Sequence, residues 1–297
     1  MYSILIATSG ERNQWLSEVL SCLARCHLSE DLFSVVVVEN GQQAGACQLV
    51  EQAPAILKAS YLYSPLANKS DALNRAMEKL PEGLVIFLDD DIRFDVDIIS
   101  MYLQASAGHQ QGIFMGGPIA PLYEQEPAPW LLAYMPPSAR GWQLASGETM
   151  KSRAFIGIHW AAFRCDLVAA GGFDPARGPG SKNRSTGQET EMQIRLRALG
   201  AYPKYIPDAL VWHHVPLARC NPDWVVDREY RRTVAKCLTA HGTDAKISGL
   251  RFKQLLRVIL MPLLDIIAMA GPRYRFLASR NRAIVRGIKD GLAVNSR

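Results

Sequence analysis

Apolar runs of strand length alternate with amphipathic segments through the first 90 residues. The apolar runs are residues 3–8, 33–38, 61–63 and 84–88, and segments with helical periodicity lie between them at 15–23, 42–53 and 69–80. Such continuous apolar runs are typical of strands that are buried on both faces of a parallel sheet. The β-α-β-α-β-α-β order therefore predicts an α/β protein with a mostly parallel, right-handed sheet between two layers of helices.

The second half of the chain has a different pattern. Helices are expected at residues 97–110 and 188–199, and strands at 114–118 and 209–215, with residues 202–205 leading into the second of these strands. Residues 153–164 predict a strand that leads into a short helix. Residues 121–150 are rich in Pro, Trp and Tyr with little periodicity, and they predict a loop over the site.

Three acidic residues, Asp89, Asp90 and Asp91, follow directly on the fourth apolar run. Ligands of open α/β sheets bind at the carboxyl ends of the strands. Adjacent carboxylates repel each other, and a divalent cation shared with a substrate phosphate relieves that repulsion. Residues two apart share a side of an extended strand, so we expect Asp89 and Asp91 on one side and Asp90 on the other. A solvated acidic turn that caps the next helix is the alternative.

Polar residues also follow the first two strands, at Thr8–Arg12 and at Glu39 and Asn40. These strand ends are expected to line one rim together with the acidic triplet. Neither a GxGxxG turn nor a GxxxxGK[ST] loop occurs in the sequence. The rim therefore predicts a nucleotide site without a glycine-rich loop, with a carboxylate for the base or ribose and a metal ion for a diphosphate.

Charge divides the chain unevenly. Residues 1–227 contain 18 Lys/Arg and 24 Asp/Glu, whereas residues 228–297 contain 15 Lys/Arg and 4 Asp/Glu. This basic tail predicts contact with an anionic surface. Its segment 251–270 is amphipathic to apolar, but the uncharged run 258–264 is far shorter than the roughly 20 residues of a membrane-spanning helix. Two interpretations stay open: an interfacial helix on the inner membrane leaflet, or an appendage packed on the preceding part of the chain or on a second subunit.

Location and partners are predicted less directly. The first residues lack a basic leader, and their apolar run has only strand length, which predicts a cytoplasmic protein with the option of peripheral attachment to the membrane. Basic residues of the tail are not joined to a nucleic-acid-binding motif, so nucleic acid is not an expected partner. The six cysteines lack CxxC spacing, which disfavours a cysteine metal site or a structural disulfide.

Taken in the order in which they occur along the chain, several sequence motifs resemble those of family 2 glycosyltransferases, which have the GT-A fold. The resemblance covers residues 1–217, so we expect a GT-A domain there and a C-terminal helical region at 218–297. The matching segments are Ile4–Thr8, Val36–Gly41, Lys69–Asn74, Phe87–Asp91, Phe155–Arg164 with Gly171–Asp174, Gly187–Glu191 and Val211–Pro216.

The resemblance implies an inverting glycosyltransferase. Such an enzyme moves a sugar from a UDP-, GDP- or TDP-sugar to a hydroxyl of a glycan or lipid-linked glycan, in a single displacement with a carboxylate base and Mn²⁺ or Mg²⁺. Glu189 is the implied catalytic base, and Asp91 and His213 are the implied metal ligands. The implied donor contacts are Thr8, Arg12, Glu39, Lys69, Asn74 and Asp89, and the implied acceptor-side residues are His159, Trp160 and Glu191.

Three positions depart from the family pattern. Glu39 stands where an Asp is usual, Gln188-Glu189 replaces Glu-Asp, and His159 replaces an Asn. These departures bear on the identity of the donor more than on the fold. The alternatives are a non-catalytic scaffold of polysaccharide assembly, a sugar nucleotidyltransferase and a retaining transferase of the same fold. Association into a homo-oligomer through the C-terminal region is a further expectation.

Overall fold

The computed structural model describes residues 1–150, 153–240 and 244–294, with no side-chain description for 244 and 245. The chain forms two compact units. The first comprises residues 1–122, 140–175 and 188–214, and the second comprises residues 123–139, 176–187 and 215–297. The division predicted at residue 217 remains a prediction.

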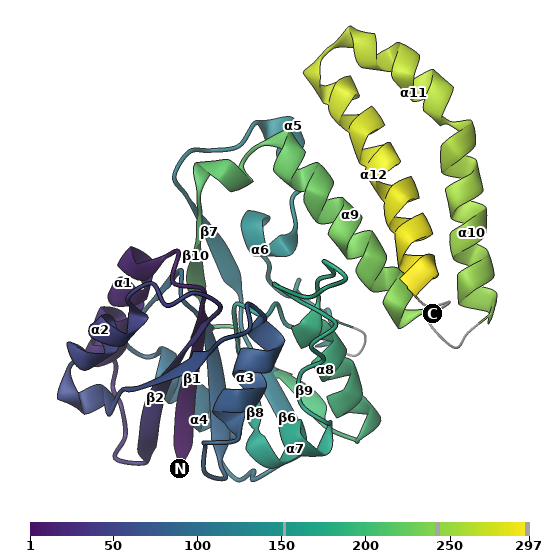
Figure 1. Cartoon of the computed structure of the whole chain (residues 1–297). Helices are drawn as coiled ribbons and strands as arrows, with labels where there is room; N and C mark the ends of the chain where they lie inside the picture. Colours follow the sequence, from purple (N-terminus) through teal and green to yellow (C-terminus); the bar gives the residue numbers. More distant parts are fainter. Residues whose placement is uncertain (151–152, 241–243, 295–297) are drawn as a thin grey trace. The chain divides into compact units, whose positions relative to one another are not determined.

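A seven-stranded sheet is the centre of the first unit (Figure 1). Its strand order is β3-β2-β1-β4-β8-β6-β9, and the first four of these strands run parallel. The strands are β1 (Tyr2–Thr8), β2 (Leu32–Asn40), β3 (Ser60–Ser64), β4 (Leu84–Asp89), β6 (Ile113–Gly116), β8 (His159–Phe163) and β9 (Tyr202–Tyr205). This mixed but mostly parallel α/β architecture confirms the predicted fold class.

Strand β8 runs antiparallel to both of its neighbours, β4 and β6. The strands β4 and β6 are therefore parallel to each other, and β8 lies between them as an antiparallel insertion. A smaller sheet, of order β5-β10-β7, contains β5 (Ile92–Phe94), β7 (Ile119–Tyr123) and β10 (Val211–Val215). The prediction of a loop at 121–150 was incomplete, since β7, α5 (Pro129–Leu132) and α6 (Pro137–Arg140) lie partly or wholly within it.

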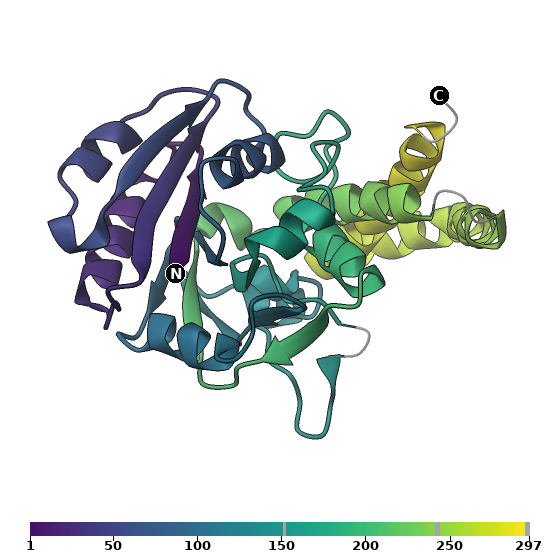
Figure 2. The same ribbon diagram turned by 90° about the horizontal axis from the view of Figure 1, so that it is seen from below.

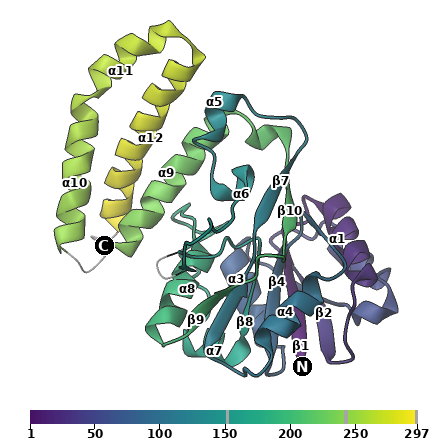
Figure 3. The same ribbon diagram turned by 180° about the vertical axis from the view of Figure 1, so that it is seen from behind.

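Helices cover both faces of the large sheet (Figures 2 and 3). Helices α1 (Asn13–Arg25), α2 (Ala46–Glu51) and α4 (Ile98–Ser106) share one apolar cluster with Ile4 and Ile6 of β1. Helices α3 (Lys69–Met77), α7 (Arg164–Ala169) and α8 (Gln188–Ala198) share the other with Leu5 and Ala7. Alternate residues of one strand thus enter two different cores, as expected for a strand buried on both faces.

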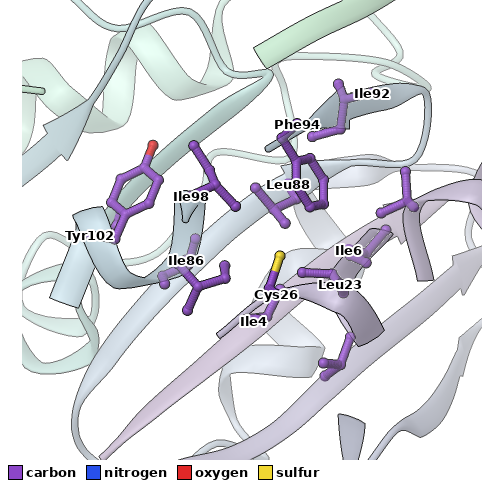
Figure 4. Close-up of a cluster of buried hydrophobic side chains, with 14 of the residues drawn as sticks. Ile4, Ile6, Leu23, Cys26, Ile86, Leu88, Ile92, Phe94, Ile98 and Tyr102 are labelled. Atoms are coloured by element: carbon purple, nitrogen blue, oxygen red, sulfur yellow. The ribbon is translucent and has the colours of Figure 1, made fainter. Parts of the chain in front are cut away.

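Figure 4 shows part of the first cluster, in which Ile4, Ile86 and Leu88 of the sheet face Leu23 and Cys26 at the end of α1 and Ile98 and Tyr102 of α4. The register of the parallel strands aligns their carboxyl ends. Thr8 pairs with Glu39, and Ala7 pairs with Asp89. This register therefore brings the polar ends of β1, β2 and β4 to one edge of the sheet.

The second unit is mainly helical. It contains α9 (Pro222–Thr239), α10 (Asp244–Ile259), α11 (Met261–Ile267) and α12 (Pro272–Val294), and α12 packs against the other three. Short 3-10 helices are η1 (Ala55–Leu57) in the first unit, and η3 (Leu217–Arg219) and η4 (Ala268–Ala270) in the second. Within the described ranges, no helix is both long and apolar enough to cross a membrane.

Candidate active site

The acidic triplet lies where the chain leaves the large sheet. Strand β4 ends at Asp89, Asp90 and Asp91 form a turn, and β5 then joins the small sheet. The turn interrupts the alternation of an extended strand. The expectation that Asp89 and Asp91 share one side was therefore wrong: Asp90 and Asp91 contact the same cation, and Asp89 contacts a different one.

Arg12 is the cation between Asp90 and Asp91. Its Nη2 lies 2.9 Å from Asp90 Oδ1, and its Nη1 donates to Asp91 Oδ2. Both carboxylates are buried, and burial raises the pKa of Asp90 to about 6 even though Arg12 lowers it. A planar guanidinium can bridge two carboxylates in this way, which a lysine ammonium does less well. Arg12 thus supplies positive charge to the acidic turn.

Lys69 joins two parts of the chain that lie far apart in sequence. Its Nζ is 2.6 Å from Asp89 Oδ1 and 3.5 Å from Glu189 Oε1. Burial alone lowers the pKa of the Lys69 ammonium, but the charges of Asp89 and Glu189 more than offset this, so its pKa is raised. The predicted base, a predicted donor contact and the helix-start lysine therefore form one cluster.

Glu189 lies in the first turn of α8, with its side chain mostly covered. Burial raises the pKa of its carboxyl group, Lys69 acts in the opposite direction, and Asp89 raises it again. The Gln188 amide donates to Glu189 Oε1 over 3.0 Å. A Cβ on Gly157 would lie 2.1 Å from Glu189 Cδ, so only glycine leaves room for this carboxylate. The sequence indicated Gln188 only as a departure from the family pattern and gave Gly157 no role, because their contacts with Glu189 depend on the fold.

His213 faces the acidic turn. Its Nε2 lies 3.5 Å from Asp91 Oδ1, and the backbone N–H of His214 donates to the carbonyl of Asp91 over 2.9 Å. His214 stacks on Trp15 of α1 with 3.7 Å between ring centroids. Trp15 in turn lies under the Arg93 guanidinium. This stack holds β10 beside the turn, and neither Trp15 nor Arg93 was predicted to have a role.

Thr8 and Glu39 line the same edge through internal contacts. Thr8 Oγ1 accepts from the N–H of Gly10 at 3.1 Å. Glu39 is fully buried and accepts from Tyr61 Oη at 2.7 Å and from the N–H of Ala44 at 2.8 Å. Glu39 thus fixes the loop between β2 and α2. Direct contact of either side chain with a nucleotide remains a prediction.

The Asn74 side chain contacts the turn at Gly171–Asp174, after α7. Its side chain accepts from the N–H of Phe173 at 2.7 Å and donates to the carbonyl of Phe173 at 2.8 Å. This paired contact ties α3 to the glycine turn after α7. Asn74 thus supports this turn through both atoms of its amide, and its contact with a donor remains a prediction.

His159 and Trp160 belong to the core rather than to an acceptor site. Tyr102 Oη lies 2.8 Å from His159 Nδ1, and the Pro118 carbonyl lies 3.1 Å from Nε2. Trp160 is buried and stacks on Phe87 at 4.8 Å. Because β8 is a central strand with residues packed on both faces, neither side chain is open to an acceptor. We therefore correct both acceptor-side expectations.

Glu191 is also directed elsewhere. It forms an ion pair with Arg195 one turn later on α8, with 2.6 Å between Oε2 and Nη2. Arg195 also donates to the carbonyls of Ala170 and Gly172. The Glu191 carboxylate thus orients an arginine that ties α8 to the glycine turn, and its expected acceptor-side role is corrected as well.

The burial of His159 predicts acid sensitivity. Burial lowers its pKa from 6.5 to about 4, outweighing the hydrogen bonds to the backbone that raise it. Between pH 6.5 and 4 the unfolded chain binds the proton that the folded chain excludes, so stability should fall as the pH falls through this window. A difference of this size amounts to about 3 kcal/mol.

This prediction can be checked by urea unfolding from pH 7 to pH 4. His159→Gln keeps one amide donor for Pro118 and one acceptor for Tyr102 but does not titrate, so it should flatten the pH dependence in this window. His27→Gln is the matched control, since the His27 side chain is 71% exposed. An unchanged slope in His159→Gln would contradict the assignment.

Neither a family model nor a curated protein sequence matches the chain. Comparison with solved structures identifies its fold as a glycosyltransferase fold of the GT-A type, as the resemblance predicted. The mannosyltransferase PcManGT from Pyrobaculum calidifontis, in complex with GDP-Man and Mn²⁺, matches with a TM-score of 0.59 and 17% identity over 98% of this chain and 86% of that chain. TarS from S. aureus matches with a TM-score of 0.54 and 14% identity over 99% of this chain and 53% of that chain.

At these identities the likeness establishes the fold. Membership of glycosyltransferase family 2 remains a prediction. The candidate site lies at the carboxyl ends of β1 and β4, where ligands of open α/β sheets bind.

Proposed function

We propose that the protein is an inverting, metal-assisted glycosyltransferase that moves a sugar from a nucleotide-diphosphate donor to an acceptor hydroxyl of a glycan or lipid-linked glycan. The observation that carries the proposal is the contact of Lys69 with both Asp89 and Glu189 at the carboxyl edge of a GT-A sheet. This contact connects Asp89, at the acidic end of β4 where a nucleotide-sugar donor would bind, to Glu189, a carboxylate that could act as a general base.

Glu189 is the proposed base. A general base works best when its pKa lies near the working pH, and burial shifts the pKa of Glu189 in that direction. The ionised carboxylate would accept the proton of the acceptor hydroxyl as that oxygen attacks the anomeric carbon. The bond from this carbon to the diphosphate oxygen breaks in the same displacement, so the configuration inverts.

Arg12 and Lys69 are the proposed cationic residues on the donor side, with Asp89 on the ribose. Both cations contact the acidic turn. Their proposed role is to stabilise the negative charge that develops on the leaving diphosphate, because preorganised charge of this kind accelerates a reaction. Thr8 and Glu39 complete the proposed donor edge, Glu39 through the loop that it fixes.

Asp91 and His213 are the proposed metal ligands. Their nearest side-chain atoms lie 3.5 Å apart, which suits two ligands of one ion at about 2.1 Å each. A carboxylate oxygen suits Mn²⁺ or Mg²⁺, and the imidazole nitrogen of His213 favours Mn²⁺, the softer of the two ions. Among the residues that the structure describes, no three His, Cys, Asp or Glu side chains form a ready metal site, so the chain alone would hold such an ion weakly. A bound ion would act as a Lewis acid toward the diphosphate. PcManGT, with GDP-Man and Mn²⁺, is the precedent on this fold.

A thermal-shift screen tests the proposal. UDP, GDP, TDP, CMP and NAD are each combined with Mn²⁺, Mg²⁺ or EDTA. One nucleoside diphosphate is expected to raise the Tm in the presence of metal, because a ligand that binds the folded state adds about 2.7 kcal/mol at a hundredfold excess over its Kd. No shift with any nucleotide would contradict the proposal.

Asp91→Asn is expected to abolish the metal-dependent part of this shift. Each variant is compared with its own ligand-free Tm, because loss of the contact with Arg12 changes stability by itself. Asp95→Asn is the matched control: it lies four residues later and is exposed. Equal ligand shifts in the two variants would contradict the assignment of Asp91.

A further inference from the structure

The helical segment from α10 to η4, residues 244–270, exposes an unusual amount of apolar surface. Nine large apolar side chains between residues 252 and 269 are 44–90% exposed. The backbone stays helical at Leu260, where the N–H donates to Leu256, and the chain continues directly into α11 (Figure 1). The surfaces of soluble proteins seldom expose contiguous apolar patches of this kind unless the patch binds an interaction partner.

Six of these side chains form a single stripe. Successive residues of an α-helix are rotated by about 100°, which places the six within an arc of about 100°. The stripe consists of Phe252, Leu255, Leu256, Ile259, Leu263 and Ile266.

Polar side chains of the same helices face α12 instead. The Gln254 amide donates to the Val285 carbonyl at 3.3 Å. Arg257 donates to Asn281 Oδ1 at 2.9 Å, and the Asn281 amide donates back to the Arg257 carbonyl at 2.9 Å. An amphipathic helix normally buries its apolar face against the protein. Here α12 contacts the side of α10 that carries Gln254, Arg257 and the partly buried Leu250, and the apolar stripe points away from α12.

The surroundings of the stripe are basic. Arg251 and Lys253 are exposed and lie on its two edges by helical position, and Arg273 and Arg275 are exposed at the start of α12. Asp265 is the sole acidic residue of the sequence between 246 and 289. It lies on the opposite side of the helix by its position and forms an ion pair with Arg282.

We propose that this stripe is a membrane-docking surface that lies in the headgroup region of an anionic lipid leaflet. Apolar side chains flanked by cations on a helix parallel to the surface bind such leaflets. A second copy of the chain is a poorer partner, because two such faces would bring basic edges of the same sign together. The inference does not depend on the proposed reaction.

Vesicle co-sedimentation of the full chain tests this docking. The protein is expected to bind vesicles of phosphatidylcholine mixed with phosphatidylglycerol more tightly than vesicles of phosphatidylcholine alone, and added salt should weaken the binding. Ile259→Glu/Leu263→Glu should weaken it at least about tenfold, since it places two carboxylates in the apolar stripe. Both side chains are more than half exposed, so the Tm should change little.

Ile56→Glu/Val168→Glu is the matched control, with two side chains of the first unit that are 55% and 53% exposed. It should bind vesicles like the unmodified protein, and so should Asp91→Asn. Absence of vesicle binding, or equal binding by Ile259→Glu/Leu263→Glu, would overturn the proposal. Self-association that this variant abolishes, without vesicle binding, would assign the stripe to a second copy of the chain.

Discussion

Replacement of Glu189 by glutamine is expected to slow sugar transfer about 10²- to 10⁴-fold, the usual contribution of a general base. Glutamine has the same shape but cannot accept the proton of the acceptor hydroxyl. Donor binding should be retained, because Asp91, His213 and Arg12 are unchanged. The measurement is release of the nucleoside diphosphate in the presence of an acceptor, with the ligand-induced change in Tm recorded on the same variant.

Glu191→Gln is the matched control for Glu189→Gln. It removes a carboxylate from the same first turn of α8, but one whose partner is Arg195. Turnover should stay within a few-fold, with a small drop in Tm from the lost ion pair. If both variants lost turnover equally, Glu189 would have no special role. If neither did while the donor still bound, the scaffold alternative would gain support.

The raised pKa of Glu189 also predicts a pH profile for the unmodified enzyme. The base acts in its ionised form, so turnover should fall as the pH falls through its pKa, which burial raises from the value of an ordinary glutamate. The residual activity of Glu189→Gln should lack this fall in turnover at low pH, which is the acid limb of the profile. If the acid limb persists unchanged in this variant, another group causes it.

The strand ends of the site were predictable from local sequence. Residues 84–88 are continuously apolar, and three carboxylates follow. An apolar run of this kind fixes a buried strand, and the fold class then fixes which edge holds the ligand. The distribution of the carboxylates was not predictable, because it depends on a turn at Asp90 and Asp91 and on the distant cations Arg12 and Lys69.

The residues that were assigned to the acceptor side show which contacts the order of sequence motifs does not predict. His159 and Trp160 occupy positions that the resemblance assigns to an acceptor, but β8 lies between β4 and β6 with packing on both faces. Asn74 likewise bonds to Phe173, 99 positions further along the chain. Contacts at such separations are decided by the tertiary fold, and no local pattern contains them.

The orientation of the C-terminal helices could not be predicted from the sequence for a different reason. The amphipathic pattern of 251–270 was compatible with a packed appendage or with an interfacial helix, because periodicity alone does not say which face meets the protein. The contacts of Gln254 and Arg257 with α12 decide the orientation. Because of these contacts the apolar stripe faces away from α12, and this orientation is the basis for the vesicle experiment.

Lys69→Met is expected to cost about 1–3 kcal/mol of stability at neutral pH, because it leaves two largely covered carboxylates without their shared cation. The Lys69 side chain is 18% exposed, and Asp89 and Glu189 are similarly covered. The estimate lies below the cost of breaking a fully buried pair, since some solvent reaches the cluster. Lys79→Met, an exposed lysine of the same region, should have little effect.

The pH dependence of this variant gives a sharper test. Without Lys69, the pKa of the Glu189 carboxyl rises further, because the neighbour that lowers it is gone. The folded variant then binds a proton that the unfolded chain releases, so its stability should fall as the pH rises and approach that of the unmodified protein in acid. Urea unfolding at pH 5 and pH 8 measures this difference. The acid limb of turnover should also move to higher pH.

A second substitution separates lost charge balance from lost packing. In Lys69→Met/Asp89→Asn one of the two uncompensated carboxylates is neutral, so part of the lost stability should return, and the two single changes should not add. If the double variant were less stable than Lys69→Met by the full cost of Asp89→Asn alone, Lys69 would act through packing of its aliphatic chain. The ion pair would then not be what holds Asp89 and Glu189 together at the edge of the sheet.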